Sequence, residues 1–103
     1  MSVPVYSTDP LYPGEDQFVE ADFSGFAELF GETGATVTCT IVSGSGMTLT
    51  GSPSWSHTTK RAQQRVAVSA GGATVLLKWA LVTAPTGLDR VGYTYVPLET
   101  APS

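Results

Sequence analysis

Residues 35–42 read ATVTCTIV, and this stretch decides the fold because its side chains alternate between two chemical kinds without a break. Val37, Cys39 and Ile41 share one side of the alternation, and threonines occupy the other side. Successive side chains of a β-strand point to opposite faces, and the branched threonine side chain suits a solvent-facing pleat. The stretch therefore predicts a half-buried strand in which Cys39 is a small core residue.

A second long segment, residues 73–83, is apolar on both faces of an alternating pattern. One face carries Val75, Leu77, Trp79 and Leu81, and the other carries a mostly apolar set: Thr74, Leu76, Lys78, Ala80 and Val82. A strand that is apolar on both faces is either central in its sheet or presented to a partner. The leucine and alanine content also permits a helix, but the flanking turn signals at 71–72 and 84–87 favour a strand. We expect Trp79 to be the core aromatic residue.

Shorter alternating runs surround these two segments, at residues 17–23, 47–50, 64–69 and 88–96. Residues 24–30 predict one helical turn that begins at Ser24 and stops at Gly31. Residues 51–59 predict an irregular segment or an edge strand. Several short strands separated by glycine-rich turns are typical of an all-β, antiparallel sandwich, which we place at residues 16–97.

The two ends of the chain lie outside this predicted sandwich. Residues 1–15 contain three prolines, which fix φ and remove donors, so they predict an extended arm rather than a sheet strand. The arm carries Tyr6, Leu11 and Tyr12, which are costly to leave in water, so it either folds back on its own domain or docks on another subunit. Residues 98–103 are expected to be a C-terminal tail.

Composition limits the classes of function. A chain of 103 residues with 42% hydrophobic residues is one folded domain, and its net charge of −4 argues against nucleic-acid binding. The single Cys39 excludes an intramolecular disulfide. The first ten residues lack the pattern of a secretory signal, and the apolar run 75–82 is interrupted and too short to span a bilayer. We therefore expect no membrane partner and folding in a cytoplasm.

The charges are segregated along the chain. Acidic residues crowd the first third, residues 33–59 contain no Asp, Glu, Lys or Arg, and all five basic residues lie between positions 60 and 90. Lys60, Arg61 and Arg65 form a basic cluster that we expect to meet the acidic segment 15–32 of a neighbouring copy or partner, because complementary charge fixes register. The alternative is an exposed loop with ordinary Arg–carboxylate pairs.

The chain shows no catalytic, cofactor-binding or metal-binding pattern. Ser56 and His57 are adjacent, so they would point to opposite faces of a strand, and no acid lies nearby to orient the imidazole. Asp9, Glu15 and Asp16 lack the alternating spacing of a calcium loop. We therefore expect a protein that is not an enzyme.

Several short motifs resemble those of the small tailed-phage proteins called fiber-tail adaptors. The opening of that family is similar to Asp22-Phe23-Ser24, Leu29 and Gly31-Glu32-Thr33 followed by the strand at 36–42. Its Gly-Gly turn is similar to residues 68–74, and its final hairpin to Thr83, Gly87 and Arg90. The resemblance covers roughly residues 16–96. It departs where the family has a strand Trp, replaced here within residues 39–41, and where Leu88-Asp89 separates Gly87 from Arg90.

The resemblance implies an immunoglobulin-like sandwich and a structural role in the virion. The expected function is an adaptor that joins tail or neck to fibers or spikes, in a homo-oligomer or ring that contacts other virion proteins. Two alternatives remain: a capsid decoration protein, and a carbohydrate-binding module in which Trp55, Tyr93 and Tyr95 stack on sugar rings. Trp55 is also a candidate exposed interface anchor. The candidate interface residues are Tyr6, Leu11, Tyr12, Trp55, Lys60, Arg61, Arg65, Leu76 and Val82.

Overall fold

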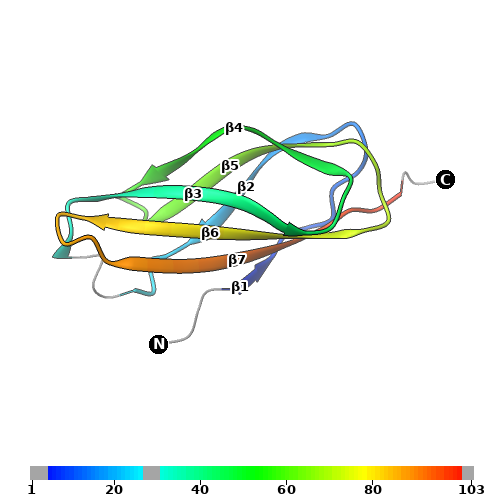
Figure 1. Ribbon diagram of the computed structural model, residues 1–103. Coiled ribbons are helices and arrows are strands. Elements are labelled where there is room, and N and C mark those ends of the chain that lie inside the picture. The colour runs from blue at the N-terminus through cyan, green and yellow to red at the C-terminus, as the bar shows by residue number, and fades with distance from the viewer. Residues whose placement is uncertain (1–4, 27–30, 101–103) are drawn as a thin grey trace.

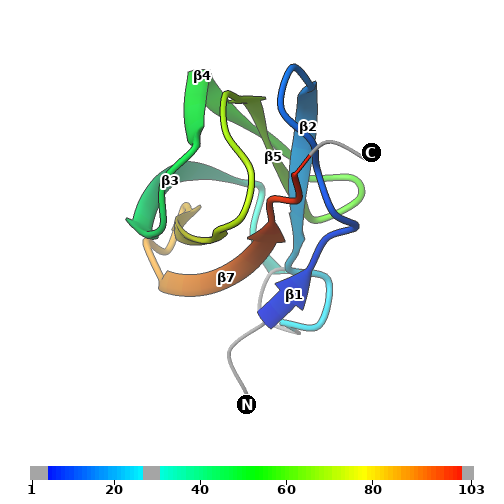
Figure 2. The same cartoon turned by 90° about the vertical axis from the view of Figure 1, so that its right-hand side faces the viewer.

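The computed structural model describes residues 5–26 and 31–100, with the side chains of residues 8–26 and 31–100. In this part of the chain the strands form two layers (Figure 1), which face each other when viewed from one end (Figure 2). The strands are β1 (Val5–Ser7), β2 (Asp16–Asp22), β3 (Gly34–Ser43), β4 (Met47–Ser56), β5 (Arg61–Val68), β6 (Thr74–Ala84) and β7 (Asp89–Pro97).

One layer is a four-stranded sheet in the order β1-β7-β6-β3, and the other is a three-stranded sheet in the order β2-β5-β4. Neighbouring strands are antiparallel, except that β1 runs parallel to β7. The prediction of an all-β sandwich is thereby confirmed. Within residues 5–26 and 31–100, no helix has the length and the apolar character needed to cross a membrane.

The strand β6 forms the middle of the larger sheet, as its two apolar faces predicted. Its inner row is fully or almost fully buried and consists of Val75, Leu77, Trp79 and Leu81. Trp79 lies in register between two small residues, Cys39 on β3 and Gly92 on β7. These small neighbours leave room for the indole ring between the sheets. Burial of each large aliphatic side chain in such a layer contributes roughly 1.5–3 kcal/mol.

The three-stranded sheet supplies the facing half of the core. Val19, Ala21, Ala62 and Val66 point inward and are buried. Phe23, which directly follows β2, is fully buried and stacks on Phe26 with ring centroids 5.8 Å apart. The alternation that predicted a strand at 17–23 therefore places the same apolar residues in the core.

The prediction that the N-terminal segment contains no sheet strand is wrong for residues 5–7, which form β1. Backbone groups of β1 pair with β7, and the amide of Leu11 donates to the carbonyl oxygen of Pro97 at 3.0 Å. Leu11 and Leu98 are both buried and form an isolated parallel bridge. Residues 5–11 therefore fold back on their own domain, which is one of the two alternatives given for the arm, and Leu98 belongs to the core rather than to a free tail. Proline spacing did not reveal this, because Pro4 and Pro10 leave residues 5–7 free to pair.

The segment after β3 was only partly predicted. β4 follows β3 after residues 44–46. It is longer than the expected 47–50, since it reaches Ser56, and it pairs with β5. Gly44 has a φ of +94°, and a Cβ there would lie 2.6 Å from the carbonyl oxygen of Thr74. Glycine is thus required where the chain crosses from one sheet to the other. The prediction that residues 51–59 contain an edge strand is confirmed by β4.

The helical turn predicted for residues 24–30 falls largely on residues 27–30, outside the described residues. Just before it, the Ser24 amide donates to Asp22 Oδ1 at 2.8 Å, and the Phe26 amide donates to the Phe23 carbonyl at 3.0 Å. Hydrogen bonds from Ser24 lower the pKa of Asp22 below its usual value. The chain therefore leaves β2 through a turn that the Asp22 carboxylate holds in place.

Candidate functional site

Arg61 and Arg65 lie on the outer face of β5 and pair with carboxylates of β2 in the same chain. Arg65 forms two parallel bonds to Asp16, Nε to Oδ1 and Nη2 to Oδ2, each 2.8 Å long. Arg61 lies 3.5 Å from Glu20 and 3.8 Å from Asp22. The hydrogen bond from Arg65 lowers the pKa of the Asp16 carboxyl. Of the two interpretations of the basic cluster, the structure shows the Arg–carboxylate pairs within one chain.

Lys60 does not join these arginines at the surface, which corrects its place in the predicted cluster. It is buried, and its Nζ donates to the carbonyl oxygen of His57. Its φ of 58° places it in the left-handed region at the turn between β4 and β5. The backbone conformation of this turn directs the side chain back over the turn, so the ammonium group caps a carbonyl instead of extending into solvent.

Trp55 is partly buried rather than an exposed anchor. Its ring meets Phe23 edge-on at 5.9 Å, and its Nε1 donates to Nδ1 of His57 at 3.3 Å. The other ring nitrogen of His57 lies 2.8 Å from the carbonyl oxygen of Glu32. Both contacts are satisfied by the neutral imidazole that carries its proton on Nε2. His57 is therefore engaged in joining β4 to the segment before β3, and Ser56 instead accepts a bond from the Thr59 amide at 3.4 Å.

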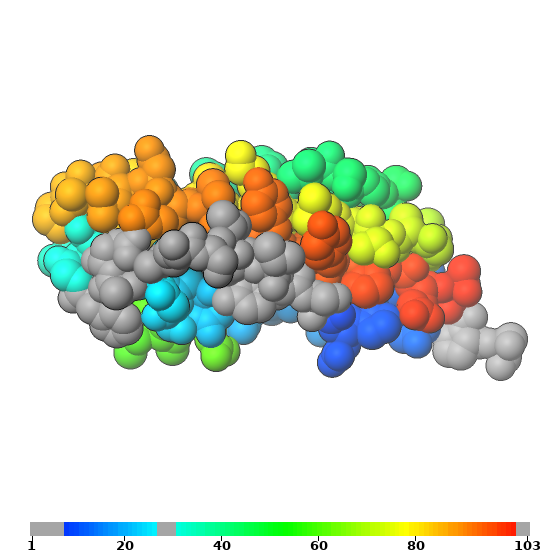
Figure 3. Space-filling view, turned by 90° about the horizontal axis from the view of Figure 1, so that it is seen from below, coloured from blue at the N-terminus to red at the C-terminus, as the bar shows by residue number. Residues whose placement is uncertain are grey.

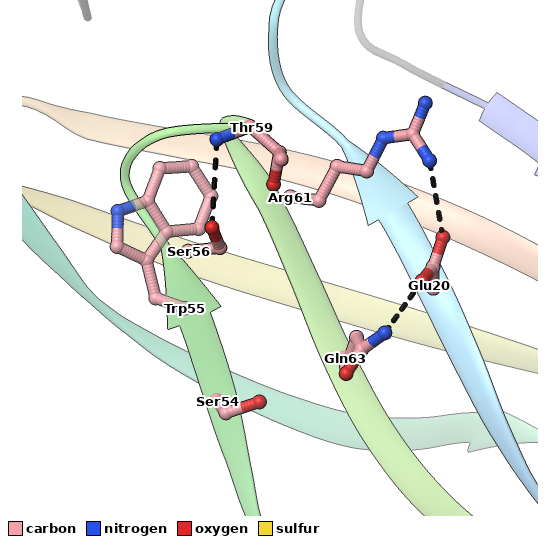
Figure 4. A pocket seen from close by; sticks show the side chains of 7 residues that line it. All are labelled: Glu20, Ser54, Trp55, Ser56, Thr59, Arg61 and Gln63. Carbon is pink, nitrogen blue, oxygen red and sulfur yellow. Dashed lines mark hydrogen bonds and ion pairs between the residues drawn. The ribbon is translucent and has the colours of Figure 1, made fainter.

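A polar depression lies on the outer face of the three-stranded sheet, around the end of β4 (Figure 4). At its floor, Glu20 accepts hydrogen bonds from Gln63 Nε2 at 2.5 Å and from Arg61 Nη1 at 3.5 Å. Its volume is about 320 Å³, and its lining residues are Glu20, Ser54, Trp55, Ser56, Thr59, Arg61 and Gln63. The depression offers both hydrogen-bond donors and acceptors to a hydroxyl-rich ligand, because carboxylate, amide, guanidinium and hydroxyl groups lie side by side in it.

A second depression of about 320 Å³ lies beside the start of β2 and is lined by residues of 8–11 and 15–19. Phe18, on its rim, is 63% exposed. Glu15 in its lining is engaged, because it accepts from the Tyr12 amide at 2.9 Å and from Gln17 Nε2 at 2.7 Å. Among the described residues, no group of three or more His, Cys, Asp or Glu side chains is placed to hold a metal ion.

The outer face of the four-stranded sheet carries the other candidate residues. Val82 and Tyr95 are 45% and 43% exposed, and Leu76 is half-buried. Residues 5–7 extend the sheet beside β7, as β1, so these described residues of the arm do not lie across Leu76 and Val82. The side chain of Tyr6 lies outside the described part, and Tyr12 is half-buried next to the core residue Leu11.

The three aromatic residues proposed for sugar stacking do not form one platform. Tyr93 and Tyr95 belong to β7 of the four-stranded sheet, and Trp55 belongs to β4 of the other sheet. Trp55 therefore shares no stacking surface with Tyr93 and Tyr95, because it lies in the other layer. Instead, Glu20 and Gln63 form the polar site, and sequence reasoning missed both. Gln63 is signalled by the outward-facing alternation of residues 61, 63 and 65, and Glu20 by the polar face of the alternation at 17–23.

Comparison with known proteins supports the fold and leaves the family open. No known protein family and no curated protein sequence matches the chain. A solved structure with a similar fold is a nucleoside hydrolase-related hypothetical protein from Saccharophagus degradans that is associated with carbohydrate metabolism. The sequence identity is 17% and the TM-score is 0.50, over 95% of this chain and 23% of that chain. The chain therefore spans less than a quarter of the length of this neighbour, with which it shares a fold.

Proposed function

We propose that the chain is a non-enzymatic structural protein of a tailed-phage virion, an adaptor that joins tail or neck to fibers or spikes. The observation that carries the proposal is the structural role of the motifs that resemble fiber-tail adaptors. Asp22 and Ser24 close the turn after β2, around the buried Phe23. Thr83 closes the final hairpin, where its Oγ1 accepts from the Leu88 amide at 2.8 Å and its carbonyl oxygen from the Gly87 amide at 2.9 Å.

The order of the strands supports the immunoglobulin-like part of the proposal. Immunoglobulin sandwiches place their second, fifth and fourth strands in one sheet and their third, sixth and seventh in the other. Here β2-β5-β4 and β7-β6-β3 have the same arrangement. The chain differs from constant-type antibody domains in lacking their disulfide and in placing β1 beside β7 rather than beside β2. A rigid sandwich of this kind offers sheet faces and edges to neighbours in an assembly.

The contacts with partners are assigned to apolar and uncharged surfaces. Arg61 and Arg65 already pair with carboxylates of their own chain, so they contribute less to docking than unpaired charges would. Phe18, Val82 and Tyr95 are large apolar side chains that stand in solvent in the isolated chain. Exposed apolar side chains of this size are common at sites of protein–protein contact.

The proposal is tested by asking where the protein is found after phage production. Particles purified by density gradient from cells that carry the gene should contain the chain in several copies, measured by quantitative mass spectrometry. Separation of tails from capsids should leave it with the tails or necks. Recovery on tailless capsids would assign it to capsid decoration, and its absence from all particles would end the virion proposal.

A carbohydrate-binding module is the second candidate, and the polar depression of Figure 4 favours it. The structural neighbour is associated with carbohydrate metabolism, and the region similar to this chain is a minor part of that protein. Bound hexose should change the fluorescence of Trp55, which lines the depression, and Gln63→Ala should abolish that change. Thr48→Ala, on the same strand as Trp55 but outside the lining, is the matched control. A glycan array without binding, together with unchanged fluorescence, would remove this candidate.

A further inference from the structure

Within residues 5–26 and 31–100, the strand β3 has one free edge, because it pairs with β6 on one side and ends the four-stranded sheet on the other. In Figure 2, β3 lies at the border of its sheet, below β4 of the other sheet. Regular pairing with β6 runs from Gly34 to Ile41, and a register shift follows before Ser43. An edge of this kind presents unpaired amide and carbonyl groups that match those of another extended strand.

The other three sheet edges of the described chain carry features that discourage such pairing. β1 has only three residues. β2 carries the carboxylates of Asp16, Glu20 and Asp22. β4 contains Pro53, and its pairing with β5 shifts register between Thr50 and Ser54. Short length, charge, proline and irregular pairing are the usual means by which native sheets protect their edges.

β3 lacks these protections along most of its length. Its ten residues include no charged residue and no proline, and its outward row consists of Thr36, Thr38 and Thr40, all exposed. At its end, Ile41 and Val42 are 37% and 53% exposed. The strand combines high β-propensity with an uncharged surface, the combination that favours strand addition.

We propose that β3 pairs antiparallel with β3 of a second copy of this chain, so that two four-stranded sheets become one continuous sheet. The twofold axis of such a dimer brings the same surface of both copies together. Antiparallel symmetric pairing sets threonine against threonine on the outer face, and Thr–Thr cross-strand pairs are favourable. Residues 33–59 contain no Asp, Glu, Lys or Arg. The contact between the two β3 strands, here called the seam, therefore places no like charges opposite each other, although each chain carries a net charge of −4.

A foreign strand fits this edge less well than a second copy does. A binding site for a specific foreign peptide needs side-chain pockets beside the edge, which give specificity to strand addition. The outward row of β3 is a uniform series of threonines, and uniform side chains complement an identical series. The pairing of β3 with β3 does not depend on a role in a virion.

The test compares two variants that carry the same change in charge. Thr36→Lys/Thr38→Lys/Thr40→Lys adds three exposed lysines to β3, and Thr48→Lys/Thr50→Lys/Ser54→Lys adds three exposed lysines to β4. Sedimentation velocity over a wide concentration range should show a reversible dimer for the wild type and for the β4 variant. The β3 variant should dimerise on the order of tenfold more weakly, or not at all, because like charges oppose each other at the seam. Near-ultraviolet circular dichroism should show that both variants are folded.

Hydrogen exchange of the wild type gives an independent readout that requires no variant. Amides of residues 35–42 should become better protected as concentration rises, and those of β4 should not. A wild type that remains monomeric up to millimolar concentration would overturn the proposal. So would equal dimerisation of the two lysine variants, or concentration-dependent growth of open-ended fibrils in place of a closed dimer.

Discussion

The Trp79 indole donates its Nε1 hydrogen to Oγ1 of Thr94 at 2.9 Å, and both residues are fully buried. The same Thr94 hydroxyl lies 3.3 Å from the carbonyl oxygen of Glu20, on the opposite sheet. Figure 3 views this side of the molecule, with β7 in orange above β2 in blue to cyan. A chain of two hydrogen bonds thus runs from the central strand β6 through β7 to β2, and joins the two layers at the core.

Replacement Thr94→Val should therefore destabilise the fold, because it leaves the buried Trp79 N–H without an acceptor. The expected loss in free energy of unfolding is about 1–3 kcal/mol. A domain of this size loses roughly 4–8 °C in melting temperature per kcal/mol. Thr94→Ser, which keeps the hydroxyl, should lose less stability than Thr94→Val in thermal and urea unfolding. Equal stability of the valine variant and the wild type would contradict the role of this bond.

Gln64 is a buried polar residue that should be needed where β4 breaks its pairing with β5. Its Nε2 lies 3.1 Å from the carbonyl oxygens of both Thr50 and Gly51, at the start of the register shift. Gln64→Met keeps the length of the side chain and removes the donor, so it should cost about 1–3 kcal/mol. Gln63→Met, on the outer face of the same strand, is the matched control, with an expected change within about 0.5 kcal/mol. Urea unfolding of the two variants measures the difference, and equal losses would contradict this role.

Burial raises the pKa of the Cys39 thiol from its ordinary value of 9.0 to about 12. At pH 8 the native thiol should react with a disulfide reagent roughly a thousandfold more slowly than the unfolded chain, because only the thiolate is nucleophilic and the raised pKa lowers the thiolate fraction by about that factor. The unfolded chain loses this proton near pH 9 while the folded chain keeps it. The stability contributed by the thiol is therefore complete below pH 9 and is lost as pH rises toward 12.

Two results decide the Cys39 prediction. Cys39→Ala should show a smaller fall in melting temperature between pH 9 and pH 11 than the wild type shows. Labelling of the folded protein at the rate of the denatured protein would show that the thiol is exposed, contrary to the packing of Cys39 against the core.

The Asp16–Arg65 pair predicts how the stability of the fold and the titration of Asp16 change at low pH. The hydrogen bond from Arg65 lowers the pKa of Asp16, so the pair stabilises the fold above the ordinary carboxyl range, and this contribution is lost as pH falls through the lowered pKa. In Arg65→Gln, the carboxyl titration of Asp16 observed by NMR should move up toward its usual value. Asp22, whose pKa is lowered chiefly by Ser24, serves as the internal control and should move little. An unchanged Asp16 titration would show that the bidentate pair does not persist in solution.

The strand framework could be predicted because it depends on alternation that is local in sequence. The pattern at residues 35–42 and at 73–83 placed Val37 and Trp79 in the core, and both are buried there. The pairing of β1 with β7 could not be predicted, because it joins positions almost ninety residues apart in the sequence. The edge of β7 pairs with β1, and Leu11 is buried beside Leu98; neither contact can be recognised from proline spacing.

The polar site was harder to predict, since it depends on backbone conformation and on register. Lys60 is drawn inward by its left-handed backbone at a turn, although its sequence neighbours suggest an exposed basic loop. Gln63 and Glu20 come together because β2 and β5 pair in one particular register, in which the two residues are directly opposite. The alternation predicts which residues of each strand face outward, but it does not predict which residue of the neighbouring strand lies opposite each of them.

The proposed role in a virion depends on the surfaces that this sandwich presents to neighbouring subunits. An electron-microscopy reconstruction of purified phage particles, at a resolution that shows side chains, tests it most directly. We expect the chain in several symmetry-related copies at the tail or neck, with β2 still paired to β5 and with Phe18 or Tyr95 covered by a neighbouring subunit. Particles with complete tails and fibers in which every density is assigned to other chains would contradict the claim.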